Sequence, residues 1–253
     1  MKKLLLFSTV LILSSTVYAQ RNSNSNYWNT WEYTVKDGMH KEFEKAVAKK
    51  TSLYNKTPET AIRTYSVITG PNSGNYLRVE GNKSPKDYDL DRSAEGNYWL
   101  EYVSKYLVKE AGQVRYELLK EGSYNPNPNT VKFSKYVERT TFYVKADRIL
   151  HFRRVMSRVA KVAEKRGWES TRSLYRLVNG GNRNSFVLAI GFDSYDRVEK
   201  PETETTFKED YDELFGWGSL EEDWKNYDAS LESWGEQVDM LKLIPEMSTG
   251  MMK

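Results

Sequence analysis

The sequence predicts an α+β protein built from two tandem β-α-β-β-α-β units. A strand-like segment at residues 27–36 recurs at 136–145, and a strand–turn–strand pattern at 65–81 recurs at 175–191. An asparagine- and proline-rich stretch, which can continue neither a helix nor a central strand, separates the two copies at residues 125–129. Because element order and spacing agree, duplication is favoured over chance similarity.

Each unit opens with a strand and a helix. Residues 27–36 and 136–145 alternate aromatic or β-branched side chains with others, which is typical of a half-buried strand. Apolar residues then step by three and four along the chain, as on one face of a helix. Phe43 and Phe152 keep the same offset as the strands, and we expect Phe152 and its neighbour Leu150 to face the core.

A hairpin, a second helix and a last strand complete each unit. Turn residues close the predicted hairpins, whose strands cover residues 65–70 and 76–81 in one unit and 175–180 and 186–191 in the other. The second helices share a Trp-x-x-Tyr pair, which is Trp99 and Tyr102 in the first unit and Trp224 and Tyr227 in the second. The last strand-like runs begin near Gln113 and Gln237.

The predicted strands are apolar on both faces. Val187 and Ala189 alternate with Phe186 and Leu188, so both sets of side chains need cover. Helices can cover one face of a four-stranded sheet. The other face is then covered best by the sheet of the second unit, and closure into a barrel also removes exposed edges.

This repeated element order is the ferredoxin-like pattern, and it resembles the dimeric α/β-barrel superfamily. Members include antibiotic-biosynthesis-monooxygenase-like, NIPSNAP-like and chlorite-dismutase-like families. The resemblance covers roughly residues 27–245 and rests on element order, not on a sequence motif. It implies that the two units pair their sheets into one pseudo-dimeric α/β barrel. The expected division is a signal peptide (1–19), a first repeat (20–124), a linker (125–130) and a second repeat (131–253).

The segment 1–19 has the pattern of a signal peptide. Lys2 and Lys3 precede an apolar run from Leu4 to Leu13, and Val17 and Ala19 suit the −3 and −1 positions of a cleavage site. No later stretch has the ~18 apolar residues of a membrane span. We therefore expect a soluble protein, exported to the periplasm or beyond after cleavage near Ala19.

Composition excludes several kinds of chemistry. The chain has no cysteine, which excludes disulfides, thiol nucleophiles and iron–sulfur clusters. Its net charge of +3 is mostly the signal peptide, because removing Lys2 and Lys3 lowers the basic side chains from 38 to 36 against 35 acidic ones. Nothing in this balance favours a nucleic-acid partner.

The histidines do not form a recognisable metal or catalytic site. His40 and His151 do not match at the repeat offset, and both are interpreted as structural. The resemblance to chlorite-dismutase-like proteins implies haem with an axial histidine, yet His151 cannot be mapped to that family's motif. We therefore predict no metal and no cofactor.

Charge is unevenly divided within the second unit. Its first helix is basic, whereas residues 202–223 are rich in Asp and Glu. Because the two helices of a ferredoxin-like unit lie side by side, we expect these segments to be neighbours that pair with each other. The basic residues are Arg148, Arg153, Arg154, Arg158, Lys161, Lys165 and Arg166.

Arginine and aromatic residues within the predicted strands are the candidate ligand-binding residues. They suit a pocket, inside the barrel or between sheet and helices, for a small anionic or aromatic ligand. Three classes of function stay open: a non-catalytic ligand- or partner-binding protein, a cofactor-independent monooxygenase-like enzyme, and a haem-dependent enzyme. The absence of an acid–base constellation favours the first. The candidates are Trp31, Tyr33, Arg63, Tyr65, Arg78, Arg139, Tyr143, Arg172, Tyr175 and Arg176.

Overall fold

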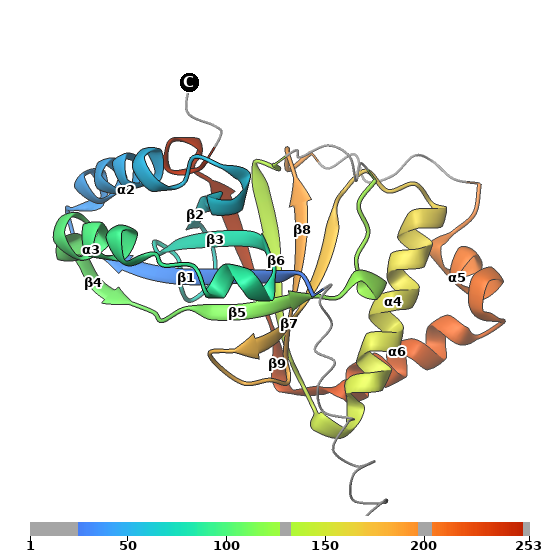
Figure 1. The fold of residues 1–253 in the computed structure, drawn as a ribbon. Coiled ribbons are helices and arrows are strands. Elements are labelled where there is room, and N and C mark those ends of the chain that lie inside the picture. The colour runs from blue at the N-terminus through green and yellow to red at the C-terminus, as the bar shows by residue number, and fades with distance from the viewer. Residues whose placement is uncertain (1–24, 127–132, 197–203, 250–253) are drawn as a thin grey trace, which may run out of the picture.

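The computed structural model describes residues 25–126, 133–196 and 204–249 (Figure 1). The predicted signal peptide at residues 1–19 and most of the predicted linker lie outside these ranges. Across the described ranges, no helix combines the length and the apolar character needed to cross a bilayer.

Each half contains strands and helices in the predicted order. The first half comprises β1 (Tyr27–Val35), α2 (His40–Tyr54), β2 (Arg63–Val67), β3 (Tyr76–Lys83), α3 (Ser93–Tyr102), β4 (Leu107–Glu110) and β5 (Val114–Leu118). The second comprises β6 (Tyr136–Val144), α4 (Ile149–Lys165), β7 (Arg172–Asn179), β8 (Ser185–Phe192), α5 (Phe207–Phe215), α6 (Ser219–Ser230) and β9 (Leu231–Leu243). Strand β4 and the division of the acidic region into α5 and α6 were not predicted.

The strands form one closed antiparallel barrel. Of the nine strands in the sheet, all but β4 make a ring in the order β1-β3-β2-β9-β6-β8-β7-β5, which β5 closes by pairing with β1. The order is β5-β1-β3-β2 in one half and β9-β6-β8-β7 in the other. The halves join where β2 pairs with β9 and β5 pairs with β7. The predicted barrel is therefore confirmed.

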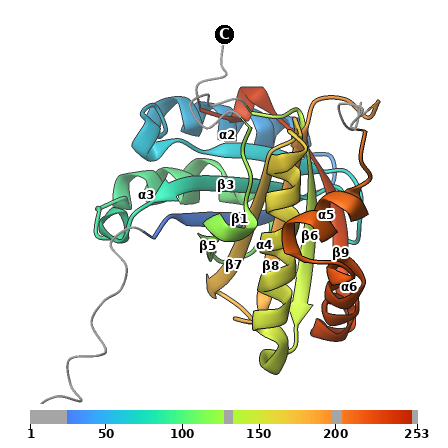
Figure 2. The same cartoon turned by 90° about the vertical axis from the view of Figure 1, so that its right-hand side faces the viewer.

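Helices cover the outside of the barrel, as Figures 1 and 2 show. Under α2 and α3, Phe43 packs against Tyr33, Tyr76 and Trp99. Under α4, a second cluster is centred on Phe142, Phe152 and Phe186, each at most 2% exposed. Strands β1 and β6 therefore bury one set of alternate residues under helices and turn the other set into the barrel.

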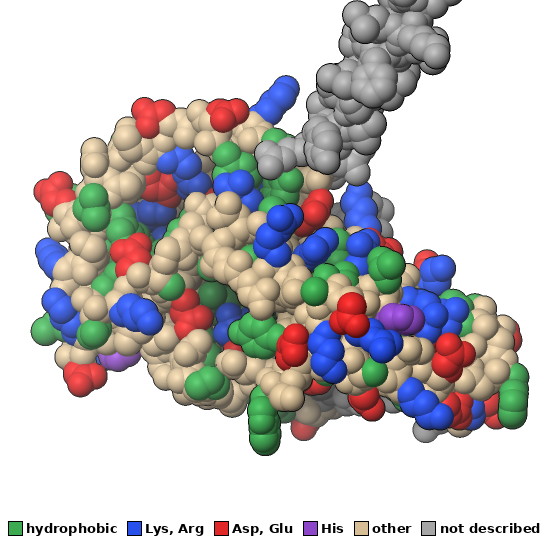
Figure 3. All heavy atoms as spheres, turned by 90° about the horizontal axis from the view of Figure 1, so that it is seen from below, with side chains coloured by type: hydrophobic (Ala, Val, Ile, Leu, Met, Phe, Trp, Pro, Cys, Tyr) green, Lys and Arg blue, Asp and Glu red, His purple; other side chains and the backbone are tan. Residues whose placement is uncertain are grey.

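The basic helix α4 pairs with the acidic helices α5 and α6, as predicted. Asp223 on α6 lies 2.6 Å from both Arg154 and Arg158, and Asp210 on α5 pairs with Lys165 and Arg166. Seen from below, basic and acidic side chains are interspersed over this end of the molecule (Figure 3). The basic run of α4 is thus largely neutralised within the chain.

One detail of the sequence interpretation was wrong. Leu150 does not face the core, because it is 77% exposed whereas the nearby Phe152 is fully buried. Successive helical residues point about 100° apart, so the two side chains lie on opposite sides of the helix and only one can face the sheet. The Trp-x-x-Tyr pairs also differ in environment, since Trp99 is buried and Trp224 is 43% exposed.

Candidate functional site

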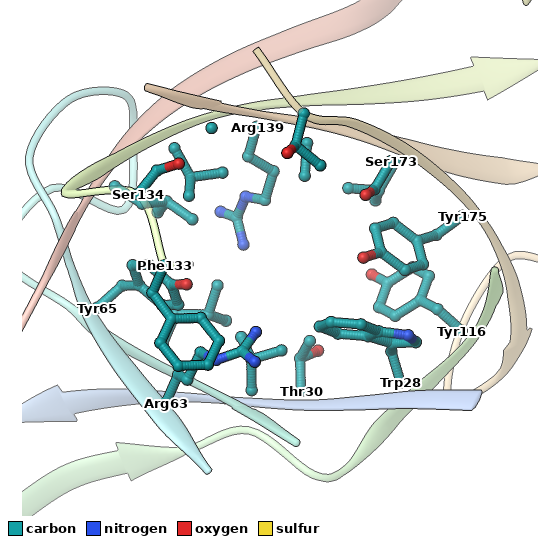
Figure 4. Close-up of a pocket in the computed structure, with 18 residues that line it drawn as sticks. Trp28, Thr30, Arg63, Tyr65, Tyr116, Phe133, Ser134, Arg139, Ser173 and Tyr175 are labelled. Atoms are coloured by element: carbon teal, nitrogen blue, oxygen red, sulfur yellow. The ribbon is translucent and has the colours of Figure 1, made fainter. Parts of the chain in front are cut away.

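The candidate site is a cavity of about 200 Å³ inside the barrel. Inward-facing residues of every ring strand, together with Phe133 and Ser134 just before β6, line it (Figure 4). Most of the lining is apolar, including Leu77, Val79 and Val187. The polar groups are mainly arginine guanidinium groups and hydroxyl groups, and no carboxylate belongs to the lining.

Four of the ten predicted site residues line this cavity. They are Arg63 and Tyr65 from β2, Arg139 from β6 and Tyr175 from β7. Arg63 and Arg139 reach into the cavity from opposite walls (Figure 4). Tyr65 and Tyr175, which occupy matching places in the two predicted repeats, lie on different walls of the cavity.

The other six predicted residues do not line the cavity. Trp31 and Tyr33 pack in the cluster under α2 and α3, and Arg78 donates a 2.8 Å hydrogen bond to Thr51 on α2. Arg172 contacts Met156 on α4, Arg176 lies over Phe186, and Tyr143 near the end of β6 is 38% exposed. The prediction mixed both faces of the strands, because alternation alone does not say which set points inward.

Sequence reasoning missed Trp28 and Tyr116, which both line the cavity. Trp28 lies on the opposite face of β1 from Trp31 and Tyr33. Tyr116 belongs to the short strand β5, which gives little pattern to read. Once Tyr65 is known to point inward, the pairing of β2 with β3 and of β3 with β1 gives the inward set on β1.

Arg63 lies between two aromatic rings. Its guanidinium carbon is 3.4 Å from the ring centroid of Phe133 and 5.8 Å from that of Trp28. Among the described residues, no Asp or Glu forms an ion pair with Arg63. Burial lowers the pKa of Arg63 from its usual 12.5, with an opposing effect from Tyr65 and Tyr175. Arg63 carries its positive charge at neutral pH, because the guanidinium group of arginine keeps its proton in proteins.

Arg139 is in a different electrostatic state. Its Nη2 atom is 2.6 Å from Oδ2 of Asp239, which lies directly opposite on β9 and is fully buried. A second carboxylate, Glu32, lies 3.9 Å from Nη1. Arg139 is therefore neutralised by the protein, and it serves the cavity as a hydrogen-bond donor rather than as an uncompensated charge.

Tyrosine hydroxyls supply the remaining strong donors. Burial raises the pKa of Tyr65, Tyr116 and Tyr175 above the usual value of 10. Each therefore stays protonated at physiological pH. A ligand in this cavity meets hydroxyl and guanidinium donors on an otherwise apolar wall, which suits an acceptor-rich or anionic molecule.

The Trp28 indole packs directly against the backbone of Gly81, which has no side chain to displace it. A Cβ atom at Gly81 would lie 2.8 Å from Cζ3 and Cη2 of the indole, closer than real Cβ contacts. The Gly81 backbone needs no positive φ, so the requirement for glycine here is one of space. Trp28 also contacts Tyr175, with 5.3 Å between ring centroids.

The described residues do not fit a haem held by an axial histidine. Neither His40 nor His151 lines the cavity, and His40 is exposed with its Nδ1 atom 3.2 Å from the Tyr76 hydroxyl. Between α4 and the sheet, Phe142, Phe152 and Phe186 pack against one another in a buried apolar cluster. The described ranges also contain no group of three or more potential His, Asp or Glu metal ligands.

Comparison with known proteins identifies the fold but no family. No family model matches the chain, and no curated protein matches its sequence. A candidate monooxygenase from Lactobacillus acidophilus NCFM has a similar structure, with a TM-score of 0.56 at 12% identity over 89% of this chain and 96% of that one. A candidate monooxygenase from Fusobacterium nucleatum subsp. nucleatum gives a TM-score of 0.58 at 8% identity, over 87% and 92% of the two chains.

An anthrone oxidase-like protein has a TM-score of 0.52 at 10% identity, over 87% of this chain and 91% of its own. A candidate chlorite dismutase gives a TM-score of 0.51 at 9% identity, over 88% of this chain and 96% of that one. At such low identity these likenesses establish the fold alone, an antiparallel barrel with helices outside.

Proposed function

We propose that this protein binds a small organic molecule inside the barrel. The observation that carries the proposal is the convergence of Arg63, Arg139 and three tyrosine hydroxyls on one apolar cavity. Ligand sites are typically apolar cavities with a few placed polar groups. A cavity near 150 Å³ can hold benzene, so about 200 Å³ suits a molecule of one or two rings.

Calorimetric titration with one- and two-ring aromatic molecules tests this proposal. The probes are 2-naphthoate and its neutral isostere 2-naphthamide. Ala189 lines the cavity, so Ala189→Leu should fill it and weaken binding by about tenfold or more. The exposed Val108→Leu is the matched control and should bind as the wild type does. Failure of both probes to bind, or unchanged binding by Ala189→Leu, would overturn the proposal.

The second candidate function is oxygenation of a bound aromatic molecule without a cofactor. It is supported by the fold shared with two candidate monooxygenases and an anthrone oxidase-like protein. In such a reaction the substrate supplies the electrons: an activated CH₂ group and O₂ give a carbonyl group and water. Arg139 and the tyrosines would stabilise negative charge that develops on the substrate oxygen.

Oxygen uptake with oxindole, a two-ring molecule with an activated CH₂ group, tests the second candidate. One O₂ should disappear per oxindole, with one ¹⁸O atom from labelled O₂ entering the new carbonyl group of the product and the other leaving as water. The rate should exceed that of spontaneous oxidation and should fall in the Ala189→Leu variant. A rate equal to the background, with oxindole binding retained, would leave a binding protein and exclude this oxidation.

We also propose that the protein is exported after cleavage near Ala19. Support comes from the pattern of a basic start, an apolar run and small residues before the cleavage site. Expression of the whole chain in a Gram-negative bacterium, followed by mass measurement, should give a protein beginning at Gln20 in the periplasm or medium. Recovery of the uncleaved chain from the cytoplasm would contradict export.

We further infer that the two halves arose by duplication. The strand order that the two halves share supports this inference. Two residue pairs also support it, because Tyr65 is separated from Tyr175 by the same number of residues as Gly81 is from Gly191. The differing burial of Trp99 and Trp224 counts against close equivalence of the second helices. Superposition of segment 27–118 on segment 136–243 should bring both pairs into register. A best fit in another register would contradict duplication.

A further inference from the structure

We infer that the cavity selects a flat aromatic monoanion, whose negative group pairs with Arg63 and whose ring stacks on Trp28. This inference rests on the proposed binding function and specifies its ligand class. It depends on three features of the described residues: the unpaired charge of Arg63, the different state of the other strand arginines, and the space that Gly81 leaves for the indole.

The strand register explains why no Asp or Glu among the described residues pairs with Arg63. Its cross-strand neighbour on β3 is Val79, and the pairing of β2 with β9 begins only at Tyr65. Neither neighbouring strand therefore brings a carboxylate opposite it. Partly buried charges in proteins are normally paired, so an uncompensated guanidinium that faces a cavity suits an anion from outside.

Two other strand arginines, Arg139 and Arg78, differ from Arg63 because protein side chains accept hydrogen bonds from their guanidinium groups. Arg139 sits opposite Asp239 in the register and binds it at 2.6 Å. Arg78 is fully buried, but its N–H groups reach the hydroxyls of Thr51 and Thr64, and it faces α2 rather than the cavity. Arg63 is thus the lining cation that is left to pair with a ligand.

Flat aromatic surfaces flank the same guanidinium. The Trp28 indole is pressed onto Gly81, and the Phe133 ring covers Arg63 from the other side (Figure 4). A planar ring can lie on the exposed indole face while its acidic group reaches Arg63. The Tyr116 and Tyr175 hydroxyls can then donate to an oxygen further along the ligand.

Calorimetry with 2-naphthoate and 2-naphthamide separates charge from shape. Wild-type protein should bind the carboxylate about tenfold or more tighter than the amide, because a hydrogen bond to a charged group is stronger. Arg63→Gln should abolish this preference and leave amide binding nearly unchanged. The control is Arg176→Gln, since Arg176 lies on the outer face of β7 and its removal should keep the preference.

A second pair of variants tests the stacking surface. Gly81→Ala should displace the indole and weaken both probes by a similar factor of about ten, because it alters the shape and not the charge of the site. Gly96→Ala on α3 has nothing within 4 Å of the new methyl group and should leave both affinities unchanged. A Gly81→Ala protein that binds both probes as the wild type does would overturn the role of Trp28.

The outcomes distinguish the inference from the proposed function. Equal binding of both probes, abolished by Ala189→Leu, would overturn the anion selectivity and keep the binding function. No binding of either probe would overturn both. If Arg63→Gln does not fold, NMR of wild-type protein labelled at arginine nitrogen decides. The Arg63 Nε–H signal should shift with 2-naphthoate and not with 2-naphthamide. No shift with 2-naphthoate, or an equal shift with both probes, would overturn the inference.

Discussion

Arg158 on α4 donates a 2.6 Å hydrogen bond to Asp223 on α6, a carboxylate that is only 1% exposed. Arg154 and the Tyr211 hydroxyl donate to the same carboxylate, so one side chain ties α4, α5 and α6 together. Asp223→Asn should therefore lower the free energy of unfolding by about 2–4 kcal/mol, because it leaves two arginines without their counter-ion. Urea unfolding measures this change.

Glu222 is the control for that substitution. It lies 3.6 Å from Arg154 but is 73% exposed, so Glu222→Gln should change the free energy of unfolding by at most about 0.5 kcal/mol. Equal effects of Asp223→Asn and Glu222→Gln would show that the buried position of Asp223 does not matter.

The Asp223 carboxylate should make the free energy of unfolding depend on pH in the acidic range. Burial alone would raise the pKa of Asp223, but hydrogen bonds from Tyr211, Arg158 and Arg154 outweigh it and hold the pKa below the usual 3.8. Its contribution is therefore present above the pKa of the unfolded chain and is lost as the pH falls through the lower folded value. The difference in unfolding free energy between wild type and Asp223→Asn should narrow below about pH 4, and a constant difference down to pH 2 would contradict this account.

Lys50 should make stability rise with pH on the alkaline side. This lysine is 4% exposed and pairs with Glu95, and burial with the nearby Arg78 lowers its pKa from 10.5 to about 7. Between these values the unfolded chain binds more protons, so the free energy of unfolding increases with pH, by up to about 1.4 kcal/mol per pH unit. Urea unfolding at pH 7, 8 and 9 should show this slope in the wild type and in the exposed-site control Lys49→Met, and a flatter one in Lys50→Met. An equal slope in all three proteins would show that a group other than Lys50 causes the pH dependence.

Two glycine substitutions should change stability in opposite directions. Gly96→Ala lies inside α3 with open space around the new methyl group, so it should stabilise the protein by about 0.5–1 kcal/mol. Gly81→Ala forces the methyl group against Trp28 and should cost about 1–3 kcal/mol. Thermal unfolding measures both, and a stabilising Gly81→Ala would mean that the indole moves away without cost.

Local patterns were sufficient to predict much of the architecture. Strands apolar on both faces need cover on both sides, and that requirement pointed to paired sheets with helices outside. The basic run of α4 and the acidic segment that became α5 and α6 predicted their contact, since opposite charges on neighbouring helices pair. These features depend on periodicity and charge, which the sequence displays directly.

The sequence by itself determined the element order, the absence of cysteine chemistry and the charge division of the second half. Only the tertiary structure decided which residues form the site. Alternation along a strand defines two faces but not which one points inward, so Trp31 and Tyr33 were chosen where Trp28 lines the cavity. The strand register in the closed ring places Asp239 opposite Arg139, whereas it places Val79 opposite Arg63. That difference depends on how whole strands align across the closed ring, and local sequence patterns do not contain it.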